Sequence, residues 1–386
     1  MSFQRIENIE VRGKRVFVLS DLNFNGNAMD SIKLNKFLPT IDLLSRKGAK
    51  IILANHSSLS DRASVLMDAL KNFGKSLKIG ETNSLSEISK ISPTLSEGDI
   101  YILPNLNQFP EDEKNDKSFA EELSKIADIY VNDAFSIANK KLASNDSITE
   151  FLPSYAGTLF HREYETLNNL LNKPDKPYIA MIGGSKVSSK IKILNSLLNR
   201  ANTILVGGGL AYTFLKARAV PVGSSVIEKD FEVLSHQFID KAGIAGVEFQ
   251  MPVDHVISDI FGEKGKTKNV DRMGILDGWM GMDIGSKTLS AYEKILKNAG
   301  TIFWTGAFGV TELEKFSTGS VNLAKILSKT GAKTVLSGEN TINAVLKAGV
   351  ESKITHISTG GEATIEFLEG KSLPAIKALG REKDTE

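Results

Sequence analysis

Two lysines, Lys186 and Lys190, stand four residues apart directly after a pair of glycines. The five residues before those glycines, 178–182, are apolar, which predicts a buried parallel strand. The glycine pair predicts a sharp turn, and Ser185 stands at the N-cap of an expected helix that places both ammonium groups on one face. Such a helix N-terminus favours an anion, most simply a phosphate. An ordinary strand-to-helix turn with two solvated lysines is the alternative interpretation.

The composition argues against several classes of site and partner. A chain of 386 residues is long enough for two cores, and its net charge of +1 argues against nucleic acid or a membrane surface as a partner. The absence of cysteine removes disulfides, thiolate metal sites and cysteine nucleophiles, and the five histidines form no ligand-spaced pair for zinc. The sequence contains no apolar run of about 20 residues and no signal-like N-terminus. We therefore expect a cytoplasmic protein.

The elements around the lysine motif begin with a first α/β region. Short apolar runs alternate with amphipathic stretches, which predicts a mostly parallel sheet. The expected strands are residues 16–19, 51–54, 100–103 and 129–131, and the expected helices lie near residues 32–45, 63–73, 85–88 and 119–126. Polar residues follow each strand, namely Asp21, Asn23, Asn55, His56, Asn105, Asn107, Asn132 and Asp133. Because ligands bind at the carboxyl ends of such strands, we expect one shared cleft, with ordinary turn chemistry as the alternative.

A second α/β region follows a helical run over residues 159–171 and a proline-containing break at residues 173–177. Its expected strands are residues 178–182, 203–206, 247–251, 256–257, 301–304, 334–336 and 356–358. Glycine follows several of these strands, at positions 183–184, 207–209, 306, 338 and 360–361. Because glycine lets the backbone approach a ligand closely, this region predicts a nucleotide site.

Six longer motifs carry a family resemblance over nearly the whole chain. They are YVNDAF at 130–135, GGSKVSSKI at 183–191, GGGLAYTFLK at 207–216, PVD at 252–254, GWMGMDIG at 278–285 and HISTGG at 356–361. By these motifs, their order and their spacing, the chain resembles the phosphoglycerate kinase family. The resemblance implies two doubly wound, mostly parallel-sheet α/β domains of the Rossmann-like type, joined by a long helix and a hinge.

The resemblance also implies domain bounds and a reaction. The N-terminal, phosphoglycerate-binding domain would comprise residues 1–155 and, because the last helix returns to it, residues 370–386. A linking helix would cover residues 156–176, and the C-terminal nucleotide-binding domain residues 177–369. The expected reaction is glycolytic phosphoryl transfer between 1,3-bisphosphoglycerate with ADP and 3-phosphoglycerate with ATP. The resemblance further implies Mg²⁺ on the nucleotide and a monomeric, hinge-bending enzyme.

Each functional position that the resemblance implies is assigned to a residue of this chain. The expected substrate-binding residues are Asp21, Asn23, Lys33, His56, Asn107 and Lys140. The expected nucleotide-binding residues are Gly184, Ser185, Lys186, Lys190, Gly207, Gly208, Gly209, Thr305, Val310, Glu312, Gly338, Asn340 and Thr341. The expected catalytic residues are Lys33, Lys190, Gly360 and Gly361, and Asn340 is the candidate metal ligand.

The chain departs from the family pattern mainly at these sites. The positions where arginine is usual hold Lys33, Leu59, Asn107 and Lys140. Lysine keeps the charge but loses the two-pronged hydrogen bonding of arginine, and leucine and asparagine keep neither. On the nucleotide side the departures are Asn340 for an aspartate and Glu339 and Glu362 for glycines. Glu362 is expected at a helix N-terminus, where its carboxylate would occupy an anion site.

Three functions stay open at this point. The first is a phosphoglycerate kinase with altered catalytic efficiency, which the retained lysines, His56 and Glu312 favour. The second is a catalytically impaired or inactive relative that acts as a nucleotide-binding or protein-interaction scaffold, which the lost arginines and Asn340 favour. The third is a kinase for a different carboxylate acceptor, because the changes crowd the glycerate side. We take the family reaction as the prediction.

Overall fold

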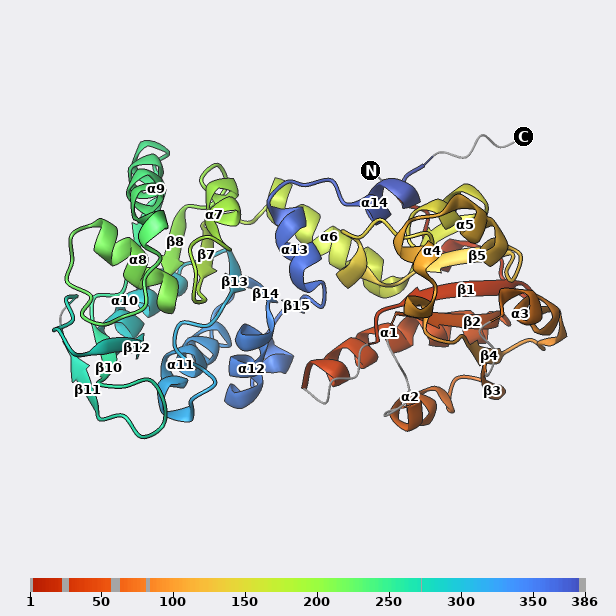
Figure 1. The fold of residues 1–386 in the computed structure, drawn as a ribbon, viewed down its shortest axis with the longest axis horizontal. Coiled ribbons are helices and arrows are strands. Elements are labelled where there is room, and N and C mark those ends of the chain that lie inside the picture. Colours follow the sequence, from red (N-terminus) through yellow and green to blue (C-terminus); the bar gives the residue numbers. More distant parts are fainter. Residues whose placement is uncertain (1–2, 23–27, 57–62, 81–83, 272, 382–386) are drawn as a thin grey trace. The chain divides into compact units, whose positions relative to one another are not determined.

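The computed structural model describes the whole chain except residues 1–2, 23–27, 57–62, 81–83, 272 and 382–386 (Figure 1). The chain divides into two compact units. Unit 1 comprises Met1–Glu165, Glu362–Phe367 and Lys371–Glu386, and unit 2 comprises Thr166–Gly361 and Leu368–Gly370. The division falls within helix α6, Thr158–Asn172, so this helix begins in unit 1 and ends in unit 2.

Unit 1 contains a six-stranded parallel sheet in the order β3-β4-β2-β1-β5-β6. The strands are β1 Arg15–Ser20, β2 Lys50–Asn55, β3 Ser76–Ile79, β4 Asp99–Ile102, β5 Ile129–Asn132 and β6 Ser154–Ala156. The central strands β1 and β2 are apolar runs buried on both faces, as in parallel sheets that helices cover. The four predicted strands are confirmed to within one residue at each end, whereas the sequence patterns do not predict β3 and β6.

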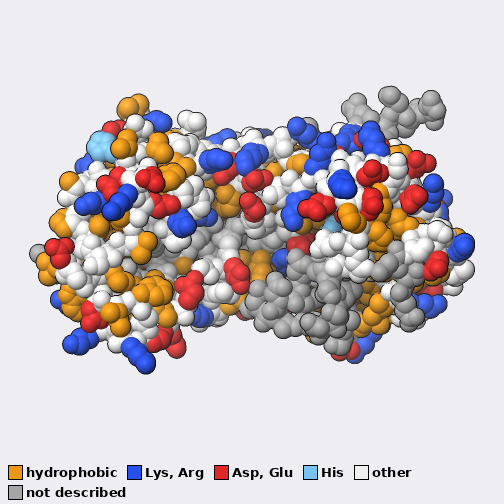
Figure 2. All heavy atoms as spheres, in the orientation of Figure 1, with side chains coloured by type: hydrophobic (Ala, Val, Ile, Leu, Met, Phe, Trp, Pro, Cys, Tyr) orange, Lys and Arg blue, Asp and Glu red, His pale blue; other side chains and the backbone are white. Residues whose placement is uncertain are grey.

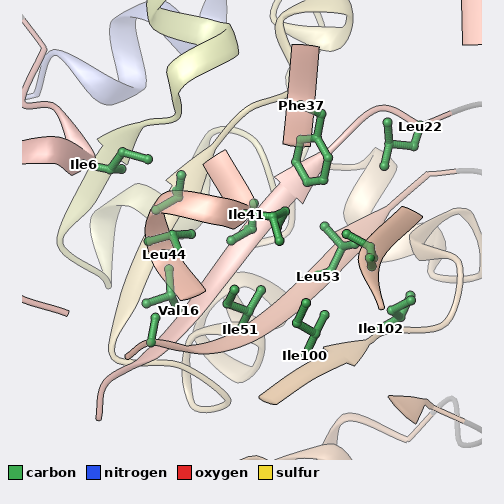
Figure 3. Close-up of a cluster of buried hydrophobic side chains, with 14 of the residues drawn as sticks. Ile6, Val16, Leu22, Phe37, Ile41, Leu44, Ile51, Leu53, Ile100 and Ile102 are labelled. Atoms are coloured by element: carbon green, nitrogen blue, oxygen red, sulfur yellow. The ribbon is translucent and has the colours of Figure 1, made fainter. Parts of the chain in front are cut away.

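Helix α1, Ala28–Arg46, packs one face against this sheet (Figure 3). Phe37 and Ile41 stand four residues apart and are fully buried in one cluster with side chains of β1, β2 and β4. Burial of an apolar side chain of this size contributes about 1.5–3 kcal/mol. The cluster therefore fixes α1 against the sheet, and with it the position of Lys33 relative to Asp21 at the end of β1.

The remaining helices of unit 1 are short. They are α2 Ala63–Leu70, α3 Leu85–Ile91, α4 Pro110–Glu113, α5 Lys117–Ser124, most of α13 Gly361–Leu368, and the last helix, α14 Pro374–Leu379. Ala375 N of α14 donates a hydrogen bond to Ala138 O at 3.1 Å. Just beyond α14, Arg381 forms an ion pair with Asp146 at 2.6 Å. These two contacts hold the carboxyl-terminal helix within unit 1.

Unit 2 contains a second six-stranded parallel sheet, in the order β15-β14-β13-β7-β8-β9. Its strands are β7 Tyr178–Ile182, β8 Thr203–Val206, β9 Glu248–Gln250, β13 Thr301–Thr305, β14 Lys333–Ser337 and β15 His356–Ile357. A three-stranded antiparallel sheet consists of β10 His255–Ser258, β11 Thr267–Val270 and β12 Met280–Ile284. The predicted strands are confirmed with small shifts at their ends, whereas β11 and β12 are not predicted. The two mostly parallel sheets confirm the predicted fold class.

Helices pack against these sheets of unit 2. They are α7 Ile191–Leu197, α8 Gly209–Ala217, α9 Glu232–Ile244, α10 Ser286–Leu296, α11 Thr318–Leu327 and α12 Glu339–Ala348. Helix α13, Gly361–Leu368, follows β15 but belongs to unit 1 over Glu362–Phe367, and Glu362 lies in its first turn as the sequence predicts. Each of α8 and α12 begins directly after a glycine at the end of a strand, so their N-termini lie at the carboxyl edge of the large sheet.

The surface mixes charges of both signs. Figure 2 shows Lys and Arg side chains interspersed with Asp and Glu on the visible face of each unit, in keeping with the small net charge. Across the described ranges, none of the helices is both long enough and apolar enough to cross a membrane.

Candidate active site

The carboxyl ends of β7, β13 and β14 in unit 2 border a pocket of about 670 Å³. This volume lies in the range of pockets that bind small ligands. Most of the residues predicted to bind a nucleotide line it, namely Gly184, Ser185, Lys190, Gly208, Gly209, Thr305, Val310, Glu312, Gly338 and Asn340. Parallel strands end at the same edge of a sheet, and this is why residues far apart in the sequence meet here.

Three further residues predicted for this site do not line the pocket. A Cβ at Gly207 would lie 2.1 Å from the ring of Phe308, so glycine at this position serves packing. Thr341 is buried in α12, and Lys186 is exposed on the turn after β7. The sequence pattern alone does not separate a glycine that admits a ligand from one that admits a neighbouring aromatic ring.

Backbone atoms form much of the pocket floor. Gly184 N donates to Ala307 O at 2.9 Å, and Gly208 N donates to Phe308 O at 3.0 Å. Gly208 has φ +68°, and a Cβ on it would lie 2.6 Å from Ala307 O. Because a side chain would clash with backbone there, the close approach of these turns requires glycine.

The helix predicted to begin after Ser185 is wrong at its start. Helix α7 begins at Ile191, and the preceding residues form a turn in which Lys190 N donates to Val187 O at 2.8 Å. Lys186 and Lys190 therefore do not stack one helical turn apart. Only Lys190 reaches the pocket, whereas Lys186 is exposed.

The carboxylate of Glu228 explains why the helix does not begin directly after Ser185. Ser188 N donates to Glu228 Oε2 at 2.9 Å, and Ser188 Oγ donates to Glu228 Oε1 at 2.6 Å. These donors sit where the sequence pattern places an anion-binding helix N-terminus, and Glu228 already satisfies them. A phosphate in the pocket therefore depends on other groups, of which Lys190 is the nearest candidate in the turn.

Lys190 is the single Lys or Arg among the described residues that line the pocket. Its stem passes within 3.8 Å of the position of a Cβ on Gly184. Burial lowers the pKa of Lys190, and the charge of Glu369 raises it in part. A charge in such partly desolvated surroundings attracts an anion more strongly than a charge in bulk water does.

Glu312 and Asn340 meet at another part of the lining. Asn340, in the first turn of α12, donates from Nδ2 to Glu312 Oε1 at 2.9 Å. The amide orients the carboxylate without adding charge. Among the described residues, no cluster of three or more His, Asp or Glu side chains is suited to hold a metal ion. The pocket therefore contains no complete protein cage for a cation, although Asn340 Oδ1 and the Glu312 carboxylate are oxygen ligands of the kind Mg²⁺ takes.

Apolar side chains make a further part of the pocket wall. They are Tyr212, Val226, Phe261, Met280 and Met282. Val226 is 73% exposed and Phe261 is 66% exposed, so both have free surface that a bound ligand could cover. None of them is among the residues predicted for the site. Tyr212 lies in α8 and Met280 and Met282 in β12, within motifs that the sequence shows, whereas Val226 and Phe261 lie in loops that no motif marks.

In unit 1, the predicted substrate residues Asp21 and Lys33 contact each other. Lys33 Nζ donates to Asp21 Oδ2 at 3.0 Å, and Ser136 Oγ donates to the same oxygen. Both charged side chains are largely buried, with 6% of Asp21 and 17% of Lys33 exposed. The second oxygen, Asp21 Oδ1, is buried without a hydrogen-bond partner among the described residues. Ser136 is not among the residues predicted from the sequence.

His56, which follows β2, is fixed by Asp112 and Ser144. Its Nε2 lies 2.7 Å from Asp112 Oδ2 and 3.2 Å from Ser144 Oγ, and Asn107 Nδ2 donates to the His56 backbone carbonyl. Ser144 N donates to Asp112 Oδ1 at 2.7 Å. His56 Nδ1 is buried without a partner among the described residues. The predicted pair of His56 and Asn107 is thus brought together, and Asp112 and Ser144 are additional polar partners.

Lys140, Gly360 and Gly361 are not among the contacts described above. Lys140 is exposed. Gly360 and Gly361 follow β15, where Gly360 N donates to Ser358 Oγ at 3.2 Å, and neither lines the pocket of unit 2. Asn23, and Leu59 at one of the arginine positions, lie outside the described residues.

Comparison with known proteins decides the family. The sequence model described as phosphoglycerate kinase matches residues 6–371. The chain belongs to the phosphoglycerate kinase family. The family match spans both sheets and both groups of polar residues described above, so it confirms the predicted resemblance over nearly the whole chain.

Individual relatives agree with this assignment. The phosphoglycerate kinase of Leptospira biflexa is 49% identical over 393 aligned positions, which cover 98% of each protein. The phosphoglycerate kinase of Borrelia garinii is 38% identical, with 95% of this chain and 96% of the relative covered. The solved phosphoglycerate kinase of Coxiella burnetii superposes with a TM-score of 0.87 at 31% identity and covers 98% of this chain and 99% of its own.

Within the family frame, the departure at Lys33 acquires a structural meaning. Lys33 stands where the family resemblance implies an arginine, and its ammonium group is engaged by Asp21. A lysine that already neutralises a buried carboxylate presents less free charge to a ligand than an arginine with five N–H donors. Lys33 therefore keeps a positive charge, but the ion pair with Asp21 neutralises part of that charge within unit 1.

Proposed function

We propose that the protein transfers a phosphoryl group between 1,3-bisphosphoglycerate and ADP, giving 3-phosphoglycerate and ATP, as a phosphoglycerate kinase. Membership of the family sets the reaction class, a phosphotransferase with a carboxyl acceptor. The observation that carries the proposal is the pocket of unit 2, where a glycine-lined floor, an apolar wall, one lysine and one oriented carboxylate occur together. A nucleotide has matching parts: a flat base, a ribose diol and a chain of phosphates.

On the nucleotide side, each part of the lining has a role. The base would lie against the apolar wall near Phe261 and Met280, where burying its faces is favourable. The ribose hydroxyls would donate to Glu312, which Asn340 orients. Lys190 would neutralise phosphate charge, and it acts most strongly on the transferring group because that group spreads negative charge over its oxygens in the transition state.

On the acceptor side, the proposed groups lie in unit 1. His56 would donate to or accept from the glycerate through Nδ1, which Asp112 and Ser144 leave available. Asp21 Oδ1 would accept from the glycerate hydroxyl, and Lys33 would hold its carboxylate or the moving phosphoryl group. Asn23, Asn107 and Lys140 are further proposed contacts of the acceptor. Gly360 and Gly361, which belong to unit 2, would donate from the backbone to the moving phosphoryl group. Hinge closure, a monomeric state and a cytoplasmic location stay predictions.

Mg²⁺ belongs to this proposal as a companion of the nucleotide. When bound, it supplies charge neutralisation on the β- and γ-phosphates. Asn340 Oδ1 would be its ligand from the protein side. Since one amide oxygen is no full coordination shell, the ion would arrive with the phosphates and keep water ligands, as Mg²⁺ usually does.

The test is a coupled assay of ATP-dependent consumption of 3-phosphoglycerate, with Lys190→Ala beside the wild-type protein. We expect turnover by the wild-type protein and a loss of about 100-fold or more in the variant, the scale of one removed transition-state contact. Wild-type turnover no greater than that of the variant would refute the proposal.

A second candidate function is transfer to a different carboxylate acceptor. The engaged Lys33 and the missing arginine at Asn107 favour it, because both reduce the positive charge offered to a second phosphate on the acceptor. The same assay with glycerate, which lacks that phosphate, distinguishes the two. Faster turnover with the unphosphorylated acid would support this candidate.

A further inference from the structure

Glu228 holds the turn that carries Lys190, although it does not line the pocket itself. Its two carboxylate oxygens accept from the backbone amide and the hydroxyl of Ser188, at 2.9 Å and 2.6 Å. The next residues of the turn lead through Ser189 to Lys190, and both of these line the pocket. The carboxylate thus fixes the turn two residues before the lysine that faces the ligand.

The local electrostatics support a carboxylate at this place. Burial acts to raise the pKa of Glu228, but the Ser188 hydroxyl and amide, the Val187 amide and the charge of Lys186 together lower it below the usual value for glutamate. The side chain is therefore ionised at neutral pH. Hydrogen bonds to an ionised acceptor are shorter and stronger than those between neutral groups, so this clamp is stiffer than an ordinary turn.

The same residue connects the turn to two other parts of the pocket. Glu228 N donates to Thr213 Oγ1 at 3.1 Å, and Thr213 is buried within α8, whose N-terminal Gly209 lies on the pocket. Two residues before Glu228, Val226 forms part of the apolar wall. The carboxylate of Glu228 therefore contacts the turn that carries Lys190, and its backbone amide contacts helix α8. Both contacts lie two residues along the chain from Val226 in the apolar wall.

We propose that Glu228 is a positioning residue for the nucleotide, which holds the Lys190 ammonium group and the Val226 wall in one geometry. Its carboxylate touches no reacting atom. Its effect is to keep the two ends of the ligand site, the phosphate end and the base end, at a fixed separation. This inference rests on the proposed nucleotide role of the pocket, and it adds a residue that neither the motifs nor the pocket lining identifies.

The test compares Glu228→Ala, Glu228→Gln and Ser188→Ala in the kinase assay, with KM measured separately for ATP and for 3-phosphoglycerate. We expect Glu228→Ala to raise KM for ATP about tenfold, the scale of lost hydrogen bonds to a charged group. KM for 3-phosphoglycerate should stay within about twofold, because its proposed contacts lie in unit 1. Glu228→Gln should recover much of the loss, since an amide still accepts one bond and can donate another to the hydroxyl.

The matched control is Glu248→Ala. Glu248 is a carboxylate of the same unit that accepts from Thr203 Oγ1 and Gln250 Nε2 and does not line the pocket. General destabilisation of unit 2 would lower the amount of active enzyme in both alanine variants without moving KM for ATP. The double variant of Glu228 and Ser188 should lose less than the sum of the single variants, because the two residues share one interaction.

Calorimetric titration with Mg-ADP separates this inference from the proposed function. If the wild-type protein binds Mg-ADP and Glu228→Ala binds about tenfold more weakly, the inference stands even where turnover is absent. Equal affinity in wild type and Glu228→Ala would overturn it while leaving the kinase proposal intact. Parallel increases in both KM values, or no Mg-ADP binding by the wild-type protein, would also overturn it.

Discussion

Replacing Asn340 by aspartate adds a second carboxylate beside Glu312 and tests how the pocket deals with charge. Asn340 Nδ2 donates to Glu312 Oε1 at 2.9 Å, so the substitution turns a hydrogen bond into a contact between like charges. Both residues are exposed, so the dielectric constant of water applies. Coulomb's law then gives a repulsion of about 1.4 kcal/mol at this distance, before screening by salt. If nucleotide binding requires Glu312 in its observed position, this energy equals about tenfold in affinity.

Mg²⁺ should reverse the sign of this effect, because a carboxylate at position 340 binds the ion better than the amide of asparagine does. The assay is calorimetric titration with ADP, once in EDTA and once with Mg²⁺. We expect Asn340→Asp to bind ADP about tenfold more weakly than wild type in EDTA and at least as tightly as wild type with Mg²⁺. An equal ratio of the two dissociation constants in both proteins would refute the reasoning. Asn340→Ala, which removes the hydrogen bond without adding charge, is the control.

Three further predictions concern the pocket floor, a buried acid and the substrate lysine. Gly208→Ala places a Cβ 2.6 Å from Ala307 O at φ +68°, whereas Gly349→Ala has a similar φ of +65° but open space around the new Cβ. We therefore expect the melting temperature of Gly208→Ala to be several degrees lower than that of Gly349→Ala. An equal decrease in both variants would contradict the clash. Burial raises the pKa of Asp133 to about 7, so its contribution to stability is present at low pH and is lost as pH rises through 7. In urea unfolding between pH 5 and 8, the free energy of unfolding should fall with rising pH, and it should fall less steeply in Asp133→Asn. The same dependence of this free energy on pH in both proteins would contradict the prediction. Lys33→Met leaves the largely buried carboxylate of Asp21 without its cation, and we expect the free energy of unfolding to fall by about 3 kcal/mol. The control, Lys33→Arg, should stay close to wild type. A decrease of less than about 1 kcal/mol would show that the ion pair is not stabilising.

The central strands of both sheets follow from the sequence because burial leaves a simple signal there. The strands Tyr178–Ile182 and Thr203–Val206 are predicted with their observed bounds, because a short continuous apolar run between turn residues is typical of a fully buried strand. Strands at the edges carry no such signal. Ser76–Ile79 is partly exposed and Thr267–Val270 is mostly exposed, and their polar composition resembles that of loops.

The residues of the candidate site also divide into those that the sequence predicts and those that it does not. Gly184, Lys190 and Glu312 are predicted because motifs mark them, and the structure brings them to one pocket. Glu228 and Phe261 are not predictable from local sequence, since their roles depend on contacts with segments far away along the chain. The wrong start of helix α7 has the same origin, because the residue that satisfies the turn, Glu228, stands 40 positions after Ser188.

The most direct measurement of the central claim is to follow the phosphoryl group itself. The protein is incubated with ATP labelled in the γ-phosphate and with 3-phosphoglycerate, and the products are separated after a single turnover. The account predicts label on the carboxyl group of the glycerate, as an acyl phosphate. Label that stays on ATP, or that is released only as inorganic phosphate, would contradict it.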